Sequence, residues 1–208
     1  VCGIAVLWKG GELFAVLDVI FAEMPDSVPF LLCVMLCSLA SMNFMTAPSV
    51  SLEGKCLWLL QTLPVEPWSI FQAKVRMQLL LTGLPLLLCI GCTAAVYPLH
   101  PMQLLMLLLF AGSYTLLMAL VGLFFGVKMP TLTWTNEIMP IKQGAPVMIT
   151  LFCGFGYMVL LFVGFMLLPG WILGFLGYMS CFAGANLLLS VLIYLWLRKQ
   201  GVARFSAL

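Results

Sequence analysis

The sequence carries very little charge for its length. Only 8% of its 208 residues are charged and the formal net charge is +2, whereas about a quarter of the residues of a soluble domain are charged. Hydrophobic residues make up 64% of the chain, and its mean hydropathy is +1.18. This composition excludes a soluble domain, and the sparse basic residues offer no surface for nucleic acid. We therefore expect an all-α polytopic membrane protein.

The sequence also lacks the short motifs of common enzymes. It contains no G-x-x-x-x-G-K-[ST] phosphate-binding loop, no H-E-x-x-H and no G-x-S-x-G. Its one histidine, His100, stands between Pro98 and Pro101, where a turn residue is expected rather than a catalyst. We predict that the chain is not an enzyme and itself binds no metal and no cofactor.

The eight cysteines do not form the pattern of a metal or redox centre. Cys89 and Cys92 form a C-x-x-C, and Cys33 and Cys37 are spaced to share one helix face, but both pairs fall inside apolar runs without nearby carboxylates or imidazoles. We interpret them as small apolar side chains. Residues 9–27 contain no cysteine, so no disulfide framework is indicated.

Long apolar runs are what the sequence does contain. Five of them approach or exceed the roughly 20 residues that a membrane-spanning helix needs, and none includes Asp, Glu, Lys, Arg or His: 28–47, 77–96, 102–127, 145–168 and 171–196. Residues 1–8 are apolar but too short to span, so we predict the stub of a truncated first helix there and an external segment over 9–27. Residues 1–208 would form one six-helix transmembrane domain.

Basic residues predict the orientation of this domain. Eight of the nine lie in the loops 48–76 and 128–144 or in the tail from residue 197, and only Lys9 lies on the opposite side. The positive-inside rule then places both loops and the C-terminus in the cytoplasm of a multi-pass protein of the cell membrane. Tryptophans lie at predicted span ends or in these loops, as expected of residues at the membrane interface.

The first cytoplasmic loop, 48–76, is predicted to hold a short amphipathic helix over residues 51–64. Apolar residues recur there at helical spacing, at Leu52, Cys56, Leu59 and Leu63. Pro64 and Pro67 end the pattern, and a second helix is expected from Ser69, which has capping-box spacing to Gln72. The amphipathic helix could lie on lipid headgroups or dock in a groove on a cytoplasmic partner; the residues alone leave both interpretations open.

Two blocks of residues resemble a known family. The first, S-x-E-G-K-x-x-W-x-L-x-x-L-P, comprises Glu53, Gly54, Lys55, Trp58, Leu59, Leu63 and Pro64 among its residues. The second, W-x-N-E-x-x-x-x-K-Q, comprises Trp134, Asn136, Glu137, Lys142 and Gln143. Both are similar to segments of bacterial ABC exporter permeases of the type-2 class. The resemblance covers most of residues 28–196 and is closest to the C-terminal half of the larger members.

The resemblance implies a permease subunit without its own ATPase. Its first loop would contain the coupling helix that contacts a separate nucleotide-binding subunit, and ATP with Mg²⁺ would be bound by that partner. A second permease half or subunit and the membrane lipid are the other expected partners. Export as the direction of transport follows from the resemblance alone, and the cargo is not indicated by it.

Two other functions stay open. An ion-coupled secondary transporter usually keeps an ionisable group at membrane depth, and the five runs have none, although Gly83-Leu84-Pro85 could break a helix and expose carbonyl groups to sodium. A non-transport membrane assembly protein is the further alternative. An uncharged path through the membrane would suit an amphipathic or lipid-like cargo better than an ion.

Small and neutral polar residues inside the runs predict helix contacts. Gly122 with Gly126 and Gly170 with Gly174 have the G-x-x-x-G spacing that lets helices approach closely. We expect contacts within the chain, with a dimer seam as the alternative. The neutral polar side chains are expected to hydrogen-bond between helices: Ser38, Asn43, Thr82, Ser113 and Asn186.

Overall fold

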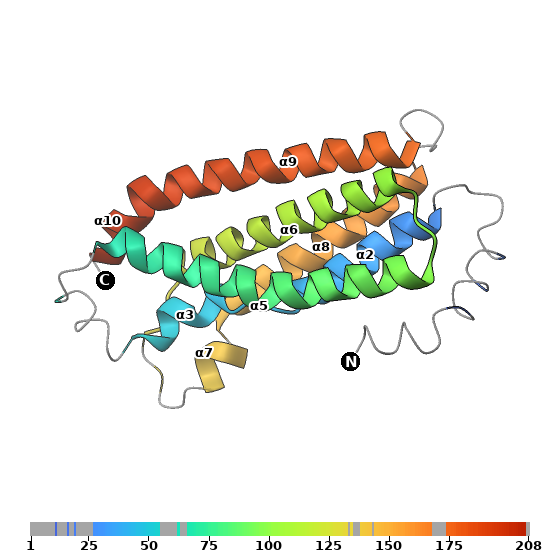
Figure 1. The fold of residues 1–208 in the computed structure, drawn as a ribbon. Coiled ribbons are helices and arrows are strands. Elements are labelled where there is room, and N and C mark those ends of the chain that lie inside the picture. Colours follow the sequence, from blue (N-terminus) through green and yellow to red (C-terminus); the bar gives the residue numbers. More distant parts are fainter. Residues whose placement is uncertain are drawn as a thin grey trace.

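The computed structural model of the chain is a bundle of long helices that run roughly along one axis (Figure 1). It describes residues 11, 16, 19, 27–54, 62, 66–132, 134, 138–142, 144–167 and 174–206. Within these ranges five helical segments are long and apolar enough to cross a membrane. The protein is therefore an all-helical, multi-pass membrane protein. The predicted stub at 1–8 lies outside the described residues, so the six-helix count stays a prediction.

The last three apolar runs match long helices closely, whereas the first two differ from the helices found there. The elements are α2 (Ser27–Ser41), α3 (Thr46–Leu52), α5 (Pro67–Val96), α6 (Pro101–Lys128), α7 (Ile138–Lys142), α8 (Ala145–Leu167), α9 (Gly174–Trp196), a π-helical turn η1 (Leu197–Gly201) and α10 (Val202–Ser206). α5 has 30 residues, which is about 45 Å at 1.5 Å per residue. It is longer than the roughly 30 Å hydrocarbon layer, so one end of α5 extends beyond it.

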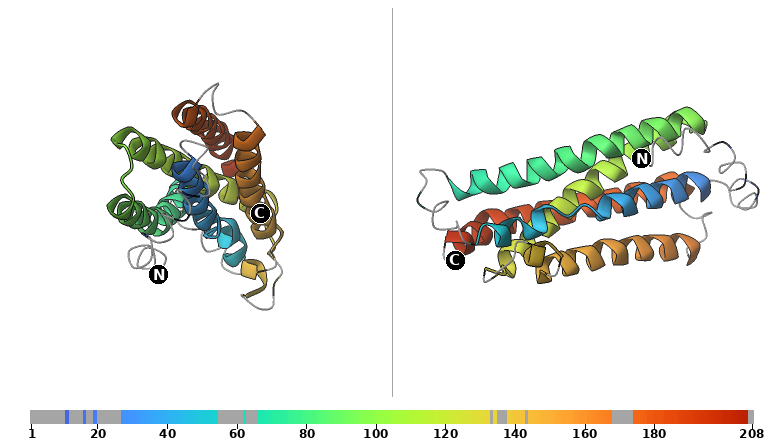
Figure 2. Two further views of the ribbon diagram at one scale, coloured as in Figure 1. Left: turned by 90° about the vertical axis from the view of Figure 1, so that its right-hand side faces the viewer. Right: turned by 90° about the horizontal axis from the view of Figure 1, so that it is seen from below.

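α6 is the central helix of the bundle. It contacts α2, α3, α5, α8 and α9, and Figure 2 shows the bundle along its axis and from below. The larger core cluster surrounds α6 and includes Phe110 and Tyr114, both fully buried, together with Cys33 and Cys37 of α2. These two cysteines are free thiols inside the core, consistent with their interpretation as apolar packing residues.

The first apolar run lies within a segment long and apolar enough to span the membrane, Ser27–Leu52, but this segment is not one continuous helix. α2 ends at Ser41, residues 42–45 are non-helical, and α3 begins at Thr46. Polar side chains of α5 form hydrogen bonds with the residues at this break. Gln78 of α5 donates through Nε2 to the Asn43 carbonyl at 2.9 Å and accepts from the Thr46 backbone N–H at 2.7 Å. One glutamine thereby satisfies groups on both sides of the break.

α5 differs from the predictions at two points. It begins at Pro67, with Glu66 as N-cap, rather than at Ser69, because proline suits the first turn of a helix, where its missing N–H is not needed. It also continues through Pro85 to Val96. Gly83-Leu84-Pro85, which the ion-coupled alternative offered as a possible break, is therefore helical, and the break lies instead in the first run.

The two ends of the bundle differ in charge. One end carries the C-terminus of α3, the beginning of α5, the end of α6, α7 and α10, and we name it the loop end (Figure 1). The described basic residues of the loops and tail lie on these elements and on η1: Lys74, Arg76, Lys128, Lys142, Arg198, Lys199 and Arg204. At the opposite end His100 caps α6, with its backbone N–H bonded to the Gln103 side chain at 3.1 Å. His100 is thus a turn and cap residue.

A second apolar cluster closes the loop end. It joins Val50 of α3, Phe71 of α5, Leu123 and Val127 of α6, and Phe205 of α10. The Phe71 and Phe205 rings meet edge to face with centroids 5.3 Å apart. The tail is helical over residues 197–206, and this cluster packs it against α5 and α6.

Candidate functional site

The two sequence blocks meet at the C-terminus of α3. From the first block the structure describes residues 51–54 and 62, and from the second Trp134 and residues 138–142. Trp134 is 9% exposed, and its Nε1–H donates to the Ser51 carbonyl at 2.7 Å. The Ser51 hydroxyl in turn accepts from the Thr131 backbone N–H at 3.1 Å. The residues that connect the two loops and the beginning of α5 here are named the loop junction: Ser51, Glu53, Gly54, Lys74, Leu132 and Trp134.

Ser51 can form hydrogen bonds with both loops because it lies in the last turn of α3. The last carbonyls of a helix have no partner in the next turn, so the Ser51 carbonyl is available to the Gly54 N–H at 3.2 Å and to the Trp134 indole. Ser51 itself is fully buried. The hydrogen bonds satisfy polar groups that would otherwise be buried without partners, and they fix the second loop against the first.

An ion pair connects the first block to α5. Lys74 donates through Nζ to Glu53 Oε1 at 2.6 Å and to the Ser49 carbonyl at 3.1 Å. The Lys74 side chain is 11% exposed and that of Glu53 is 28% exposed, so the pair is shielded from water and is not an ordinary surface salt bridge. Lys74 thereby ties the turn after α3 to the beginning of α5.

Gly54 allows the close approach of the two loops. A Cβ atom at this position would lie 3.0 Å from the Leu132 carbonyl oxygen and 3.2 Å from the Leu132 Cα. Both are backbone atoms and cannot move away without shifting the second loop. The glycine in the first block therefore allows close contact with the second loop, two residues before the second block begins.

Behind the junction, α3 is seated tightly on α6. A Cβ on Gly122 would lie 2.5 Å from Thr46 Oγ1, and one on Gly126 would lie 2.8 Å from the Ala47 carbonyl oxygen. The Thr46 hydroxyl also donates to the Ala119 carbonyl at 2.9 Å. The first G-x-x-x-G pair thus lies at a contact within the chain, between α6 and the short helix that carries the junction.

Several predicted site residues fall outside the described residues: Lys55, Trp58, Leu59, Leu63, Pro64, Asn136, Glu137, Gln143 and Gly170. Lys142 is the last residue of α7. Most of the predicted amphipathic helix over 51–64 lies outside the described residues, so it stays a prediction. Of its first residues, 51 and 52 end the short helix α3, and 53 and 54 form a turn. α3 itself begins at Thr46, whose N–H donates to Gln78.

Gly174 has a different environment from the glycines of α6. It is the first residue of α9, its φ is +63°, and a Cβ built on it would meet no atom within 4 Å. In the described structure this glycine therefore supplies a left-handed backbone conformation at the helix start, rather than a close contact between helices.

The neutral polar residues divide into two groups. Asn43 donates to Thr82 at 2.8 Å, and Asn186 accepts from the Tyr157 hydroxyl at 2.6 Å, so these connect helices as expected. Ser38 and Ser113 instead donate to carbonyls three residues earlier in their own helices. That correction has a local cause, since a serine hydroxyl inside a helix readily bonds to the preceding turn.

Sequence reasoning missed Gln78, Ser51 and the role of Lys74. Gln78 is 3% exposed and stands at the start of a predicted span, where a polar amide among apolar residues was the available signal. The partners of Ser51 are 80 and 83 residues away along the chain, so no local pattern could reveal them.

Comparisons with known proteins add no relative, since no family model, no curated protein and no solved structure matches the chain. Among the described residues there is also no group of three or more His, Cys, Asp or Glu side chains that could hold a metal ion. What the structure establishes for the loop junction is its set of internal contacts, which join the two loops to each other and to α5.

Proposed function

We propose that the chain is the membrane-spanning permease subunit of an ATP-binding-cassette exporter. The observation that supports this proposal is the loop junction, where the two blocks that resemble the type-2 permeases meet at one end of the bundle through Trp134 and Ser51. In this proposal the loop end faces the cytoplasm and receives the nucleotide-binding subunit. ATP and Mg²⁺ are bound there by the partner, and this chain contributes no catalytic residue.

The connections of the junction suit the transmission of movement. The ion pair between Glu53 and Lys74 joins the junction to α5, and Gly122 and Gly126 seat α3 on α6. Packed elements that have two discrete arrangements, rather than flexible loops, carry conformational coupling between distant sites. A displacement of α3 by the partner would be passed to α5 and α6 together, and through the break at residues 42–45 to α2.

The break in the first run also bears on the ion-coupled alternative. A coupling ion at a broken helix would need carbonyl oxygens free to bind it. Here the Asn43 carbonyl accepts from Gln78, the Thr46 N–H donates to Gln78, and the Ala40 carbonyl accepts from the Asn43 N–H. These bonds favour a structural role for the break. The experiment described next therefore has a result that would favour an ion-coupled secondary transporter.

The experiment is affinity purification of the tagged chain from membranes of its own organism, with co-purified proteins identified by mass spectrometry and ATP hydrolysis measured. We expect a nucleotide-binding subunit to be retained. Replacing Trp58 and Leu59 by Ala should release it, because burial of each such side chain contributes about 1.5–3 kcal/mol. Replacing Leu87 and Leu88, which are 55% and 71% exposed on α5, by Ala is the matched control and should leave the subunit bound.

Two results would contradict the proposal. Retention of the ATPase at the parent level by the Trp58 and Leu59 double variant would show that the first loop does not dock it. Absence of any ATPase from the purified parent, together with uptake into vesicles driven by an ion gradient, would favour the secondary transporter instead.

A further inference from the structure

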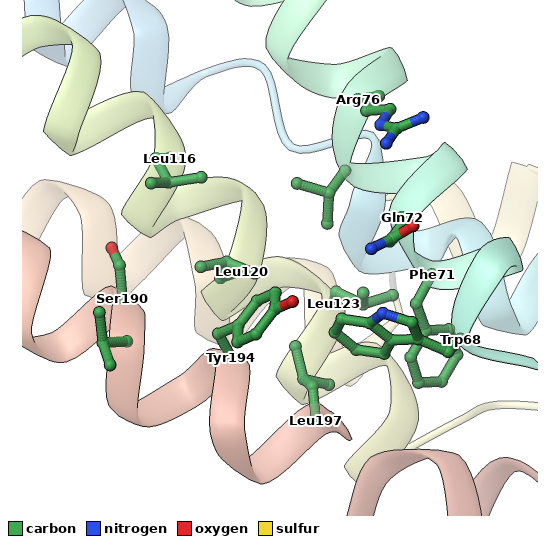
Figure 3. A pocket seen from close by; sticks show the side chains of 12 residues that line it. Trp68, Phe71, Gln72, Arg76, Leu116, Leu120, Leu123, Ser190, Tyr194 and Leu197 are labelled. Atoms are coloured by element: carbon green, nitrogen blue, oxygen red, sulfur yellow. The ribbon is translucent and has the colours of Figure 1, made fainter. Parts of the chain in front are cut away.

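An apolar crevice opens between α5 and α9 near the loop end, with α6 as its floor. Its volume is about 310 Å³, near the lower limit of ligand pockets. Figure 3 shows the side chains that line it: Trp68, Gln72 and Arg76 from α5, Leu116, Leu120 and Leu123 from α6, and Ser190, Tyr194 and Leu197 from α9 and η1. One end of the crevice is closed where the Trp68 and Tyr194 rings meet edge to face, with centroids 5.0 Å apart.

Two polar features at the crevice have no partner in the described structure. The Ser190 hydroxyl is buried, with its residue 2% exposed, and makes no hydrogen bond there. Arg76 is exposed at the rim and forms no ion pair among the described residues, in contrast to Lys74 two positions earlier. A buried hydroxyl without an acceptor costs free energy, so an occupant that supplies an acceptor would stabilise the protein.

The position of the crevice limits the chemistry of its occupant. Arg76 immediately precedes the apolar part of α5, residues 77–96, and arginines at the end of a spanning helix extend toward the headgroup level. Trp68 and Tyr194 are the residue types that favour the membrane interface. Leu116, Leu120 and Val75 make the lining of the crevice apolar, and Leu116 lies farthest from the end of α6 at Lys128. The occupant must therefore be amphipathic, with an anionic end at Arg76 and an apolar end over α6.

We propose that this crevice binds an anionic phospholipid from the leaflet at the loop end. Its phosphate lies at Arg76 and Gln72, an ester carbonyl accepts the Ser190 hydroxyl, and an acyl chain lies along Leu116 and Leu120 between α5 and α9. A basic residue between membrane helices is a recurring recognition element for anionic headgroups. The proposal requires only that the chain spans a membrane, so it stands or falls independently of the ATPase.

Native mass spectrometry of the solubilised chain, titrated with phosphatidylglycerol or phosphatidylcholine, tests this site. We expect the parent to retain phosphatidylglycerol in preference to phosphatidylcholine. Arg76→Gln should weaken phosphatidylglycerol binding about fivefold, the contribution of one basic residue at a membrane surface, and leave phosphatidylcholine unchanged. Arg198→Gln, an exposed basic residue of the same end outside the crevice, is the matched control and should bind as the parent does.

A second pair of variants tests the apolar part. Leu116→Trp fills the crevice and should abolish retention of both lipids, whereas Leu109→Trp, on the same helix at a position that is 55% exposed, should not. Equal phosphatidylglycerol binding by Arg76→Gln and Arg198→Gln would overturn the proposal. Equal retention of the two lipids by the parent would overturn it as well, even if Leu116→Trp fails to fold.

Discussion

Gln78 shows how one residue can determine the course of the chain. It lies on α5, yet its side chain bonds to the Asn43 carbonyl and the Thr46 N–H, which flank the break between α2 and α3. The sequence predicts that residues 28–47 and 77–96 both enter the membrane, because hydropathy is a property of each run by itself. It could not predict the break, because the break depends on hydrogen bonds from Gln78 to residues 32 and 35 positions away along the chain.

Gln78→Leu should destabilise the bundle. The substitution keeps side-chain bulk but leaves buried polar groups at the break unpaired, and the expected loss is about 1–3 kcal/mol of unfolding free energy. Unfolding of the purified chain by sodium dodecyl sulfate measures it. Gln200→Leu, at an exposed position of η1, is the control and should change the unfolding free energy little. Equal stability of the two variants would show that Gln78 does not hold the break.

At the scale of the element, α3 could be predicted only in part. The apolar run 28–47 and the amphipathic pattern over 51–64 each include only two residues of it, and neither predicts a separate short helix between them. The structure has a helix over Thr46–Leu52, and its N-terminal half is buried against α6. The position of α3 is determined by packing, because Gly122 and Gly126 let α3 approach α6 more closely than a larger side chain would permit.

Gly126→Ala should therefore destabilise the contact between α3 and α6. The new Cβ would lie 2.8 Å from the Ala47 carbonyl oxygen, and such overpacking costs about 1–3 kcal/mol. Gly112→Ala on the same helix is the matched control, since a Cβ there meets no atom within 4 Å, and alanine favours a helix over glycine by about 0.8–1.0 kcal/mol in water. The two variants should change the unfolding free energy in opposite directions, and a similar change in both would contradict the close contact.

At the scale of the whole molecule, charge and hydropathy predicted the architecture well. Five spanning segments and their order follow from apolar runs without ionisable residues, and the basic residues that the structure describes gather at one end. What composition could not predict is how the loops at that end meet. The contact between Trp134 and Ser51 joins positions 83 residues apart, and such pairing arises only when α3, α5 and α6 are packed together.

The orientation of the bundle is testable by thiol labelling. Thr131→Cys, at an exposed position of the loop end, should react with a membrane-impermeant maleimide only after the cells are opened. Pro98→Cys, exposed in the turn between α5 and α6, should react in intact cells, because the positive-inside rule predicts that the basic end faces the cytoplasm. The parent chain gives the background from its native cysteines. Labelling of Thr131→Cys in intact cells would reverse the orientation.

Site-specific photocrosslinking from the loop junction tests the central claim most directly. A benzophenone amino acid at Leu132, beside Gly54, would be irradiated in living cells of the native organism, with the same group at Leu99 in the opposite turn as control. The account predicts that the protein crosslinked from Leu132, and not from Leu99, carries a G-x-x-x-x-G-K-[ST] motif and binds ATP. Crosslinking from Leu132 to lipid alone, or to a protein without a nucleotide site, would contradict it.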